Sequence, residues 1–168
     1  MKKLILIAVL ALAAFSANAQ FYAGGQVGFS VAKNNTNVNV YPEVGYVLNE
    51  KMSVGAVVGF GLASVKDTYT NTNIEVSPYF RYNILEIGPV TLFADAQLEL
   101  NFWNDHNLVV DTKDSGTNFG IGIAPGIAIP VADNLSFVAH LGRVGYYRNA
   151  FVAGVDATNV FAGLYYSF

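Results

Sequence analysis

Two histidines, His106 and His140, are the side chains of this 168-residue sequence best suited to acid–base chemistry. A histidine that activates a nucleophile must lie within hydrogen-bond reach of it. His106 follows Asp105 in a polar stretch, a setting typical of a solvated loop residue. His140 lies in "VAHLGR", where alternating residue types indicate a strand and an inward-facing imidazole. A hydrolytic site would have to be built around one of these two residues.

Metal binding is suggested only by "DTKDSG", Asp111 to Gly116, which faintly resembles a calcium-binding loop. Lys113 stands where an oxygen ligand belongs, and no glutamate closes the loop. We therefore predict a flexible external loop here. The stretch "GIGIAPG" is glycine-rich but falls within a predicted strand, where glycine suits a crowded wall. The sequence predicts no metal and no cofactor.

The elements that must position these residues are strands, because apolar residues recur at every second position. Between Met52 and Leu62, one face is apolar and the other is mostly glycine and serine. Most such segments run ten residues or more. Soluble strands average about 5–6 residues, whereas membrane-spanning strands need about 9–11. The predicted fold is all-β, an eight-stranded antiparallel up-and-down transmembrane β-barrel with strands at 21–32, 38–48, 52–65, 74–85, 90–103, 118–129, 135–147 and 158–168.

The connections between these strands alternate in length. From the second connection onward they contain 3, 8, 4, 14, 5 and 10 residues. Outer-membrane barrels combine short periplasmic turns with longer external loops. We therefore predict that both termini lie in the periplasm, and that external contact surfaces lie at residues 66–73, 104–117 and 148–157.

Three prolines interrupt the predicted strands at equivalent places. Pro42, Pro78 and Pro125 each precede an acidic residue by eight positions, and each falls on the outer face of a descending strand. Proline removes one hydrogen bond from the ladder. We expect a local bulge or kink at a shared height.

The two faces of the strands differ in polarity and in size. No charge falls on the outward sets within 38–48, 74–84 and 119–129, and aromatic residues gather near strand ends, as at membrane interfaces. Inward positions of 52–65 and 118–129 are small, whereas those of 74–85 and 90–103 are large and polar. We expect the large groups to fill the space left by glycines on the opposite wall, which plugs the lumen.

Ionisable side chains at mid-height of the lumen must be paired, because an isolated buried charge is costly. Two interpretations remain open, a structural salt-bridge network and a gate or ion path. Arg143 joins the set only if its strand shifts register near Gly142, where the alternation breaks. The predicted lumen charge network is Glu43, Arg81, Asp95, Glu99, His140 and Arg143.

The N-terminus has the pattern of an export signal. Two lysines precede twelve apolar residues, Leu4 to Phe15, and an Ala-x-Ala site follows at Ala17 and Ala19. Twelve apolar residues are too few for a membrane helix, which needs about 20. The sequence therefore predicts a cleavable signal peptide at residues 1–19 and an outer-membrane β-barrel domain at residues 20–168.

The composition excludes two further classes of protein. Removing the two signal lysines from nine basic residues leaves seven against twelve acidic residues, a net charge of −5. This argues against nucleic acid as a partner. The absence of cysteine from an exported chain excludes a disulfide scaffold.

The signal, the eight alternating strands and the terminal "GLYYSF" together resemble small outer-membrane β-barrels of the OmpA/OmpX type, within the outer membrane protein beta-barrel domain group. The resemblance implies the bacterial outer membrane as location and outer-membrane lipids as surroundings. It also implies an assembly signal, Leu164, Tyr166 and Phe168, read by the barrel-assembly machinery. Lipid A deacylases of this fold carry a His-x-Ser pair, whereas Leu108 and Gly142 stand two positions beyond the histidines here.

Three roles follow for such a barrel, since this fold hosts several functions. The first is a non-enzymatic structural or surface-interaction role, with an unidentified extracellular ligand at the loops. The second is a small channel for ions or for small or hydrophobic solutes. A lipid-modifying enzyme is the third and is disfavoured by the missing serine.

Overall fold

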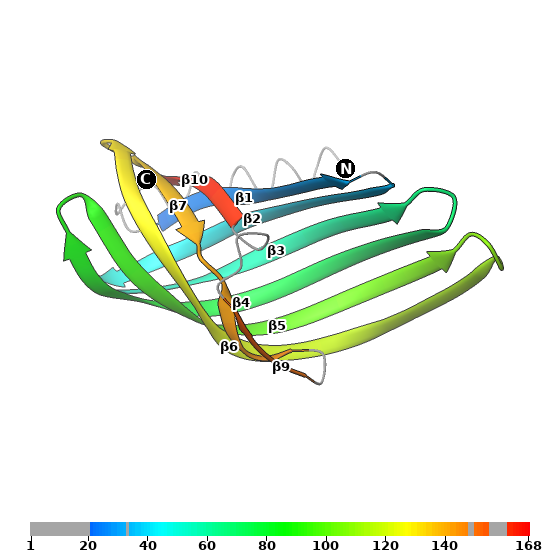
Figure 1. The fold of residues 1–168 in the computed structure, drawn as a ribbon. Coiled ribbons are helices and arrows are strands. Elements are labelled where there is room, and N and C mark those ends of the chain that lie inside the picture. Colours follow the sequence, from blue (N-terminus) through cyan, green and yellow to red (C-terminus); the bar gives the residue numbers. More distant parts are fainter. Residues whose placement is uncertain (1–20, 33, 148–149, 155–160) are drawn as a thin grey trace, which may run out of the picture.

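The computed structural model describes residues 21–32, 34–147, 150–154 and 161–168, which form one antiparallel β-barrel (Figure 1). No helix in this part of the chain is long and apolar enough to cross a membrane. The strands are β1 Phe21–Ala32, β2 Asn35–Asn49, β3 Met52–Val65, β4 Tyr69–Ile87, β5 Val90–Asn107, β6 Thr112–Ala132, β7 Leu135–His140, β8 Arg143–Tyr147, β9 Ala150–Gly154 and β10 Phe161–Ser167.

The ten segments make eight strands. β7 and β8 are successive parts of one strand, and both pair with β6. The returning strand is likewise split, because β9 pairs with β8 and β10 pairs with β7. β10 also pairs with β1, which closes the ring, and Figure 1 shows these two strands side by side. The predicted fold class, a closed eight-stranded antiparallel barrel, is confirmed.

Strand bounds match the prediction at 21–32 and 52–65, and the strands predicted at 38–48, 74–85, 90–103 and 118–129 are longer. The strand predicted at 135–147 is split into β7 and β8, and of the strand predicted at 158–168 the described part is β10. The predicted external loops 66–73 and 104–117 are wrong as loops, because only 66–68 and 108–111 connect strands there. Ala150–Gly154 is likewise a strand within the predicted loop 148–157. The physical reason is that strands of this length extend beyond the apolar layer, where outward positions turn polar and the alternation fades.

The two ends of the barrel therefore differ. At one, the short-turn end, two residues each connect β2 to β3, β4 to β5 and β6 to β7. At the other, the extended end, β4, β5 and β6 run out to the connections at 66–68 and 108–111. The predicted "DTKDSG" loop is part of this extension, since β6 begins at Thr112. His106 also lies in a strand, β5, rather than in a loop.

Register shifts by one residue between β7 and β8. His140 pairs with Gly126 and Val144 pairs with Ile123, so four steps along this strand oppose three along β6. Gly142 lies in the gap with a φ of 146°, which L side chains rarely adopt. The Leu141 amide donates to the Pro125 carbonyl at 2.9 Å. The shift turns the next odd-numbered residues inward, as a bulge does.

Of the bulge or kink expected at each of the three prolines, a bulge is absent at two. The ladder from β2 to β3 skips Pro42 and its neighbour and resumes in the same register. The ladder from β4 to β5 does the same at Pro78. Only Pro125 lies beside a bulge, and the extra residue belongs to the neighbouring strand. A missing amide costs one hydrogen bond, which a ladder can lose without slipping.

Burial along the strands is inverted relative to a soluble protein. On β4, Arg81 is 8% exposed whereas the outward Ile84 is 61% exposed. On β5, Asp95 is completely buried whereas Leu98 is exposed. Apolar side chains facing out and polar side chains facing in are the arrangement of a membrane barrel.

Six inward-facing aromatic side chains each lie directly opposite a glycine on the neighbouring strand. A Cβ added at Gly126, for example, would lie 2.7 Å from Cε2 of Phe93, its register partner. The space left by glycine is thus filled from the adjacent strand rather than from the opposite wall, which corrects the sequence-based expectation. The pairs are Tyr22 with Gly45, Tyr79 with Gly55, Phe93 with Gly126, Trp103 with Gly116, Tyr147 with Gly120 and Tyr165 with Gly24.

Candidate functional site

Five polar side chains from five strands form a closed ring of hydrogen bonds, here called the lumen ring. Arg81 donates to Asp95 twice, from Nε to Oδ1 at 2.7 Å and from Nη2 to Oδ2 at 2.8 Å. Its Nη2 also donates to Glu43 Oε1 at 3.2 Å. His140 lies 2.8 Å from Asp95 Oδ2 and 3.0 Å from Gln26 Oε1. Gln26 Nε2 completes the ring, 3.4 Å from Glu43 Oε2.

The two carboxylates of the lumen ring contact Arg81 and His140. Both nitrogens of the His140 ring lie within hydrogen-bond distance of an oxygen atom. Arg81 contacts both carboxylates, and His140 contacts that of Asp95. All four groups are buried, so each charge depends on its partners instead of on water.

Aromatic side chains seal the lumen ring. The hydroxyls of Tyr79 and Tyr165 donate to the two oxygens of Glu43, and Tyr22 hydrogen bonds to Tyr79. The guanidinium carbon of Arg81 lies 4.2 Å from the centre of the Phe93 ring and 5.0 Å from that of Tyr79. Such cation–π contacts add to the ion pairs in a desolvated site. Together these buried side chains pack against one another at the level of the ring.

The remaining two residues of the predicted network form a separate pair. Arg143 Nη1 donates to Glu99 Oε2 at 2.9 Å, and its guanidinium lies 4.5 Å from the centre of the Tyr147 ring. The inward position of Arg143 follows from the register shift at Gly142. Its side chain is 47% exposed, whereas that of Glu99 is 7% exposed. The structure thus divides the predicted network into a buried ring of four residues plus Gln26, and a more open pair.

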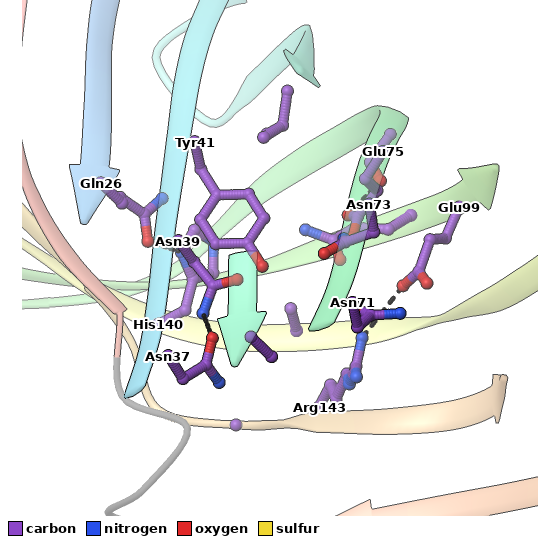
Figure 2. Close-up of a pocket in the computed structure, with 16 residues that line it drawn as sticks. Gln26, Asn37, Asn39, Tyr41, Asn71, Asn73, Glu75, Glu99, His140 and Arg143 are labelled. Atoms are coloured by element: carbon purple, nitrogen blue, oxygen red, sulfur yellow. Dashed lines mark hydrogen bonds and ion pairs between the residues drawn. The ribbon is translucent and has the colours of Figure 1, made fainter. Parts of the chain in front are cut away.

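A cavity of about 310 Å³, here called the vestibule, lies between the lumen ring and the extended end. His140 and Gln26 line its floor, and Arg143 lies at its side. Figure 2 shows Asn39 and Tyr41 reaching into it from β2, with asparagines of β4 across from them. A second hollow, which includes Trp103, shares Ala63 and Asn71 with the vestibule.

The sequence did not single out Gln26, Tyr22 or Tyr165 as network members. Each lies at an inward position of its strand, so the alternation could have placed them in the lumen. Only the closure of β1 against β10 brings Gln26 within 2.5 Å of the Tyr165 hydroxyl. Gln26 is also uncharged, so a search of the sequence for ion-pairing residues does not find it.

The lumen ring resembles an acid–base pair in one respect only. Asp95 contacts one nitrogen of His140, as the carboxylate of a catalytic triad does. The other nitrogen faces the amide of Gln26, which is not a nucleophile. Among the described residues, the two nitrogens of His140 thus contact a carboxylate and an amide oxygen.

His106, the other candidate base, contacts the turn after β5. Its Nε2 lies 2.9 Å from Asp111 Oδ1, and this contact holds the pKa of the exposed Asp111 below its usual value of 3.8. Because the pKa of the Asp111 carboxyl is lowered, the contact stabilises the turn at pH values above the usual pKa of a carboxyl group. This stabilisation is lost as the pH falls through the lowered value.

We expect His106→Ala to raise the pKa of Asp111, measured by NMR titration of the side-chain carboxyl carbon. Lys113→Ala is the matched control, because Lys113 makes the smaller favourable contribution. An Asp111 titration that is the same in the wild type and in His106→Ala would contradict the contact.

The proposed assembly residues lie along the closing strand. Leu164 and Tyr166 are exposed on the outer face of β10, and the Tyr166 ring packs against Phe168 with centres 5.2 Å apart. The Phe168 amide donates to the Phe21 carbonyl at 2.9 Å. Recognition of these residues by assembly machinery stays a prediction.

Two solved outer-membrane proteins have structures similar to this barrel. Neisserial surface protein A has 17% sequence identity over 88% of this chain and 97% of that chain, with a TM-score of 0.59. A major outer membrane protein from Thermus thermophilus has 18% identity over 89% of this chain and 98% of that chain, with a TM-score of 0.58. At such identities the likeness shows the fold alone.

Comparison of the sequence with protein families identifies the family of this chain. No curated protein matches the sequence. The model described as "Outer membrane protein beta-barrel domain" matches residues 4–168. A family of outer-membrane proteins agrees with the apolar outer face and the polar lumen. The chain therefore belongs to the outer membrane protein beta-barrel domain family.

Proposed function

We propose that this protein is an integral outer-membrane barrel with a closed lumen, and that it acts without catalysis, as a structural or surface-interaction protein. The observation that carries the proposal is the lumen ring with its aromatic cover. Asp95 and Phe93 are almost completely inaccessible to solvent, and both lie at the level of the ring. A permeation path would need solvent access at this level.

The orientation proposed for the barrel places the short-turn end in the periplasm and the extended end outside. Short periplasmic turns and longer external extensions are the usual arrangement of such barrels. Phe21 and Phe168 lie at the short-turn end, where the Phe168 amide bonds to the Phe21 carbonyl. The surface available to an extracellular ligand is then the extended end, with the exposed Val109 and Val110 at the β5–β6 connection. Outer-membrane lipids and the assembly machinery are the other proposed partners.

Planar-bilayer conductance of residues 20–168, refolded in detergent, tests the closed lumen. A heat-shifted gel mobility confirms that the barrel has folded before it is added to the bilayer. We expect no discrete conductance steps, because the lumen ring and its aromatic cover leave no wet path. A porin inserted into the same membrane serves as the positive control. Reproducible steps from folded protein would overturn the proposal and favour a small channel.

A further inference from the structure

We propose that the vestibule binds a single neutral sugar unit, such as one hexose ring. The proposal extends the proposed surface-interaction role. It depends on that role in one point only, which is the side of the membrane from which the sugar enters the vestibule. The volume, the side-chain chemistry and the floor of the vestibule each support it.

The size of the vestibule suits a small ligand. Its volume of about 310 Å³ lies at the lower end of the range of about 300–1,000 Å³ for ligand sites. The buried side chains of the lumen ring lie at the inner end, so we expect a ligand to enter from the extended end. A ligand of one ring therefore fits better than a chain that must pass through.

Carboxamide side chains dominate the wall. Two Asn-x-Asn pairs lie at matching heights, Asn37 and Asn39 on β2 and Asn71 and Asn73 on β4, and all four residues line the vestibule (Figure 2). An amide donates and accepts hydrogen bonds at the same time. Sugar hydroxyls do the same, so amides match them without charge.

Part of this hydrogen-bonding capacity is unused by the protein. Asn73 and Gln97 line the vestibule, and their side chains make no hydrogen bond to another described residue, whereas Asn39 donates to Asn37 at 3.0 Å. The Asn101 amide, two positions beyond Glu99 on β5, is buried with neither of its polar atoms hydrogen bonded to a described residue, but it does not line the vestibule. Asn73 and Gln97 are half-buried and line the vestibule, so their donors and acceptors are available to a ligand that displaces water.

Glycines of β3 lie between the two asparagine pairs in the strand register. A Cβ added at Gly59 would lie 2.7 Å from Cε1 of Tyr41, and one added at Gly61 would lie 2.7 Å from Oδ1 of Asn39. The missing Cβ atoms thus let the Tyr41 ring and the amides lean over β3. An aromatic ring beside amides suits a sugar, which presents C–H groups on its faces and hydroxyls around its rim.

The charges of the vestibule disfavour an anion. Glu99 is paired with Arg143, whereas Glu75 forms no ion pair with another described residue. Glu75 accepts a hydrogen bond from Ser77 at 2.6 Å. A neutral ligand needs no countercharge here. A small organic cation is the competing occupant, and the experiment separates the two.

The test uses Trp103, the only tryptophan of the chain, as a reporter beside the vestibule. The barrel is refolded in an amine-oxide detergent, because alkyl-glycoside detergents would present sugar rings themselves. Methyl glucoside, methyl galactoside and N-acetylglucosamine are titrated separately, with choline as the cationic probe. We expect a saturable change in Trp103 fluorescence with at least one sugar, with a dissociation constant on the order of 1 mM.

Asn73→Ala and Gln97→Ala are expected to weaken sugar binding about tenfold, as the loss of one hydrogen bond does. Thr72→Ala is the matched control, because Thr72 lies between Asn71 and Asn73 on the outer side of β4 and should leave the affinity unchanged. Heat-shifted mobility confirms the folding of each variant. Isothermal calorimetry provides a second readout that does not depend on Trp103.

Two results would overturn the proposal. One is the absence of a saturable response to every sugar in both readouts, from folded protein. The other is a response to choline alone, which would assign the vestibule to cations. The conductance experiment tests the proposed function separately. A barrel that conducts ions could still bind sugar, and a barrel that does not conduct could fail to bind sugar.

Discussion

Replacing Arg81 with alanine is expected to lower the free energy of unfolding by about 3–5 kcal/mol, the usual cost of removing one partner from a buried ion pair. The guanidinium is the only group that contacts both carboxylates of the lumen ring among the described residues. Without it, Asp95 keeps only His140 and Glu43 keeps only neutral donors. Urea titration of the refolded barrel, followed by Trp103 fluorescence, measures the loss.

Arg143→Ala is the matched control for this prediction. Its side chain is about half exposed and pairs with Glu99 near the vestibule, so water can replace it. Because Glu99 is buried, the control should cost more than an exposed ion pair, which contributes about 0–1 kcal/mol, but less than Arg81→Ala. The double variant Arg81→Ala/Asp95→Asn should be less destabilised than the sum of its single variants, because it removes one of the unpaired charges. An unchanged unfolding midpoint for Arg81→Ala would remove Arg81 from any stabilising network.

Substituting valine for Gly126 is expected to destabilise the barrel by about 1–3 kcal/mol through overpacking. An added Cβ would overlap the Phe93 ring and would lie 2.9 Å from the Ala139 carbonyl oxygen. The ring is almost completely buried and covers Arg81, so it has little room to move. The carbonyl belongs to β7 and can move only with that strand. Urea unfolding and heat-shifted gel mobility both report the effect.

Gly25→Ala distinguishes this packing effect from a general cost of losing glycine. Gly25 lies on β1, and a Cβ there would meet its nearest atom, the Tyr41 carbonyl oxygen, at 3.4 Å. That distance is an ordinary contact, so the control should unfold at or above the wild-type midpoint, since alanine reduces the entropy of the unfolded chain. If Gly126→Val were as stable as Gly25→Ala, the glycine–aromatic pairs would not be structural requirements.

Both predictions concern residues that the sequence places in the lumen. The sequence does not show which residues they contact there. The alternation alone places Arg81 and Asp95 in the lumen, because the side-chain period of a strand is two. It does not show that Gln26 links Glu43 to His140, since that requires β1 to meet β10 and β7 to follow β10. Likewise, Gly126 is recognisable as a small wall residue, but its pairing with Phe93 depends on the register between β5 and β6.

The class of fold, the number of strands and the polarity of the two faces follow from the sequence alone, because a membrane barrel needs long alternating strands with apolar residues outside. The bounds of two strands, 21–32 and 52–65, also follow from it, since their ends coincide with clear turn signals. The prediction was wrong at 66–73 and 104–117 because, beyond the apolar layer, hydrogen bonding between strands continues after the alternation has faded.

Which inward residues meet one another depends instead on the tertiary structure. The bulge at Gly142 placed Arg143 beside Glu99, and closure of the barrel assembled the lumen ring from five strands. The vestibule is likewise a product of register, since the asparagines of β2 and β4 converge only across the glycines of β3. Long-range register depends on the sum of all pairings around the ring, which no local stretch of sequence contains.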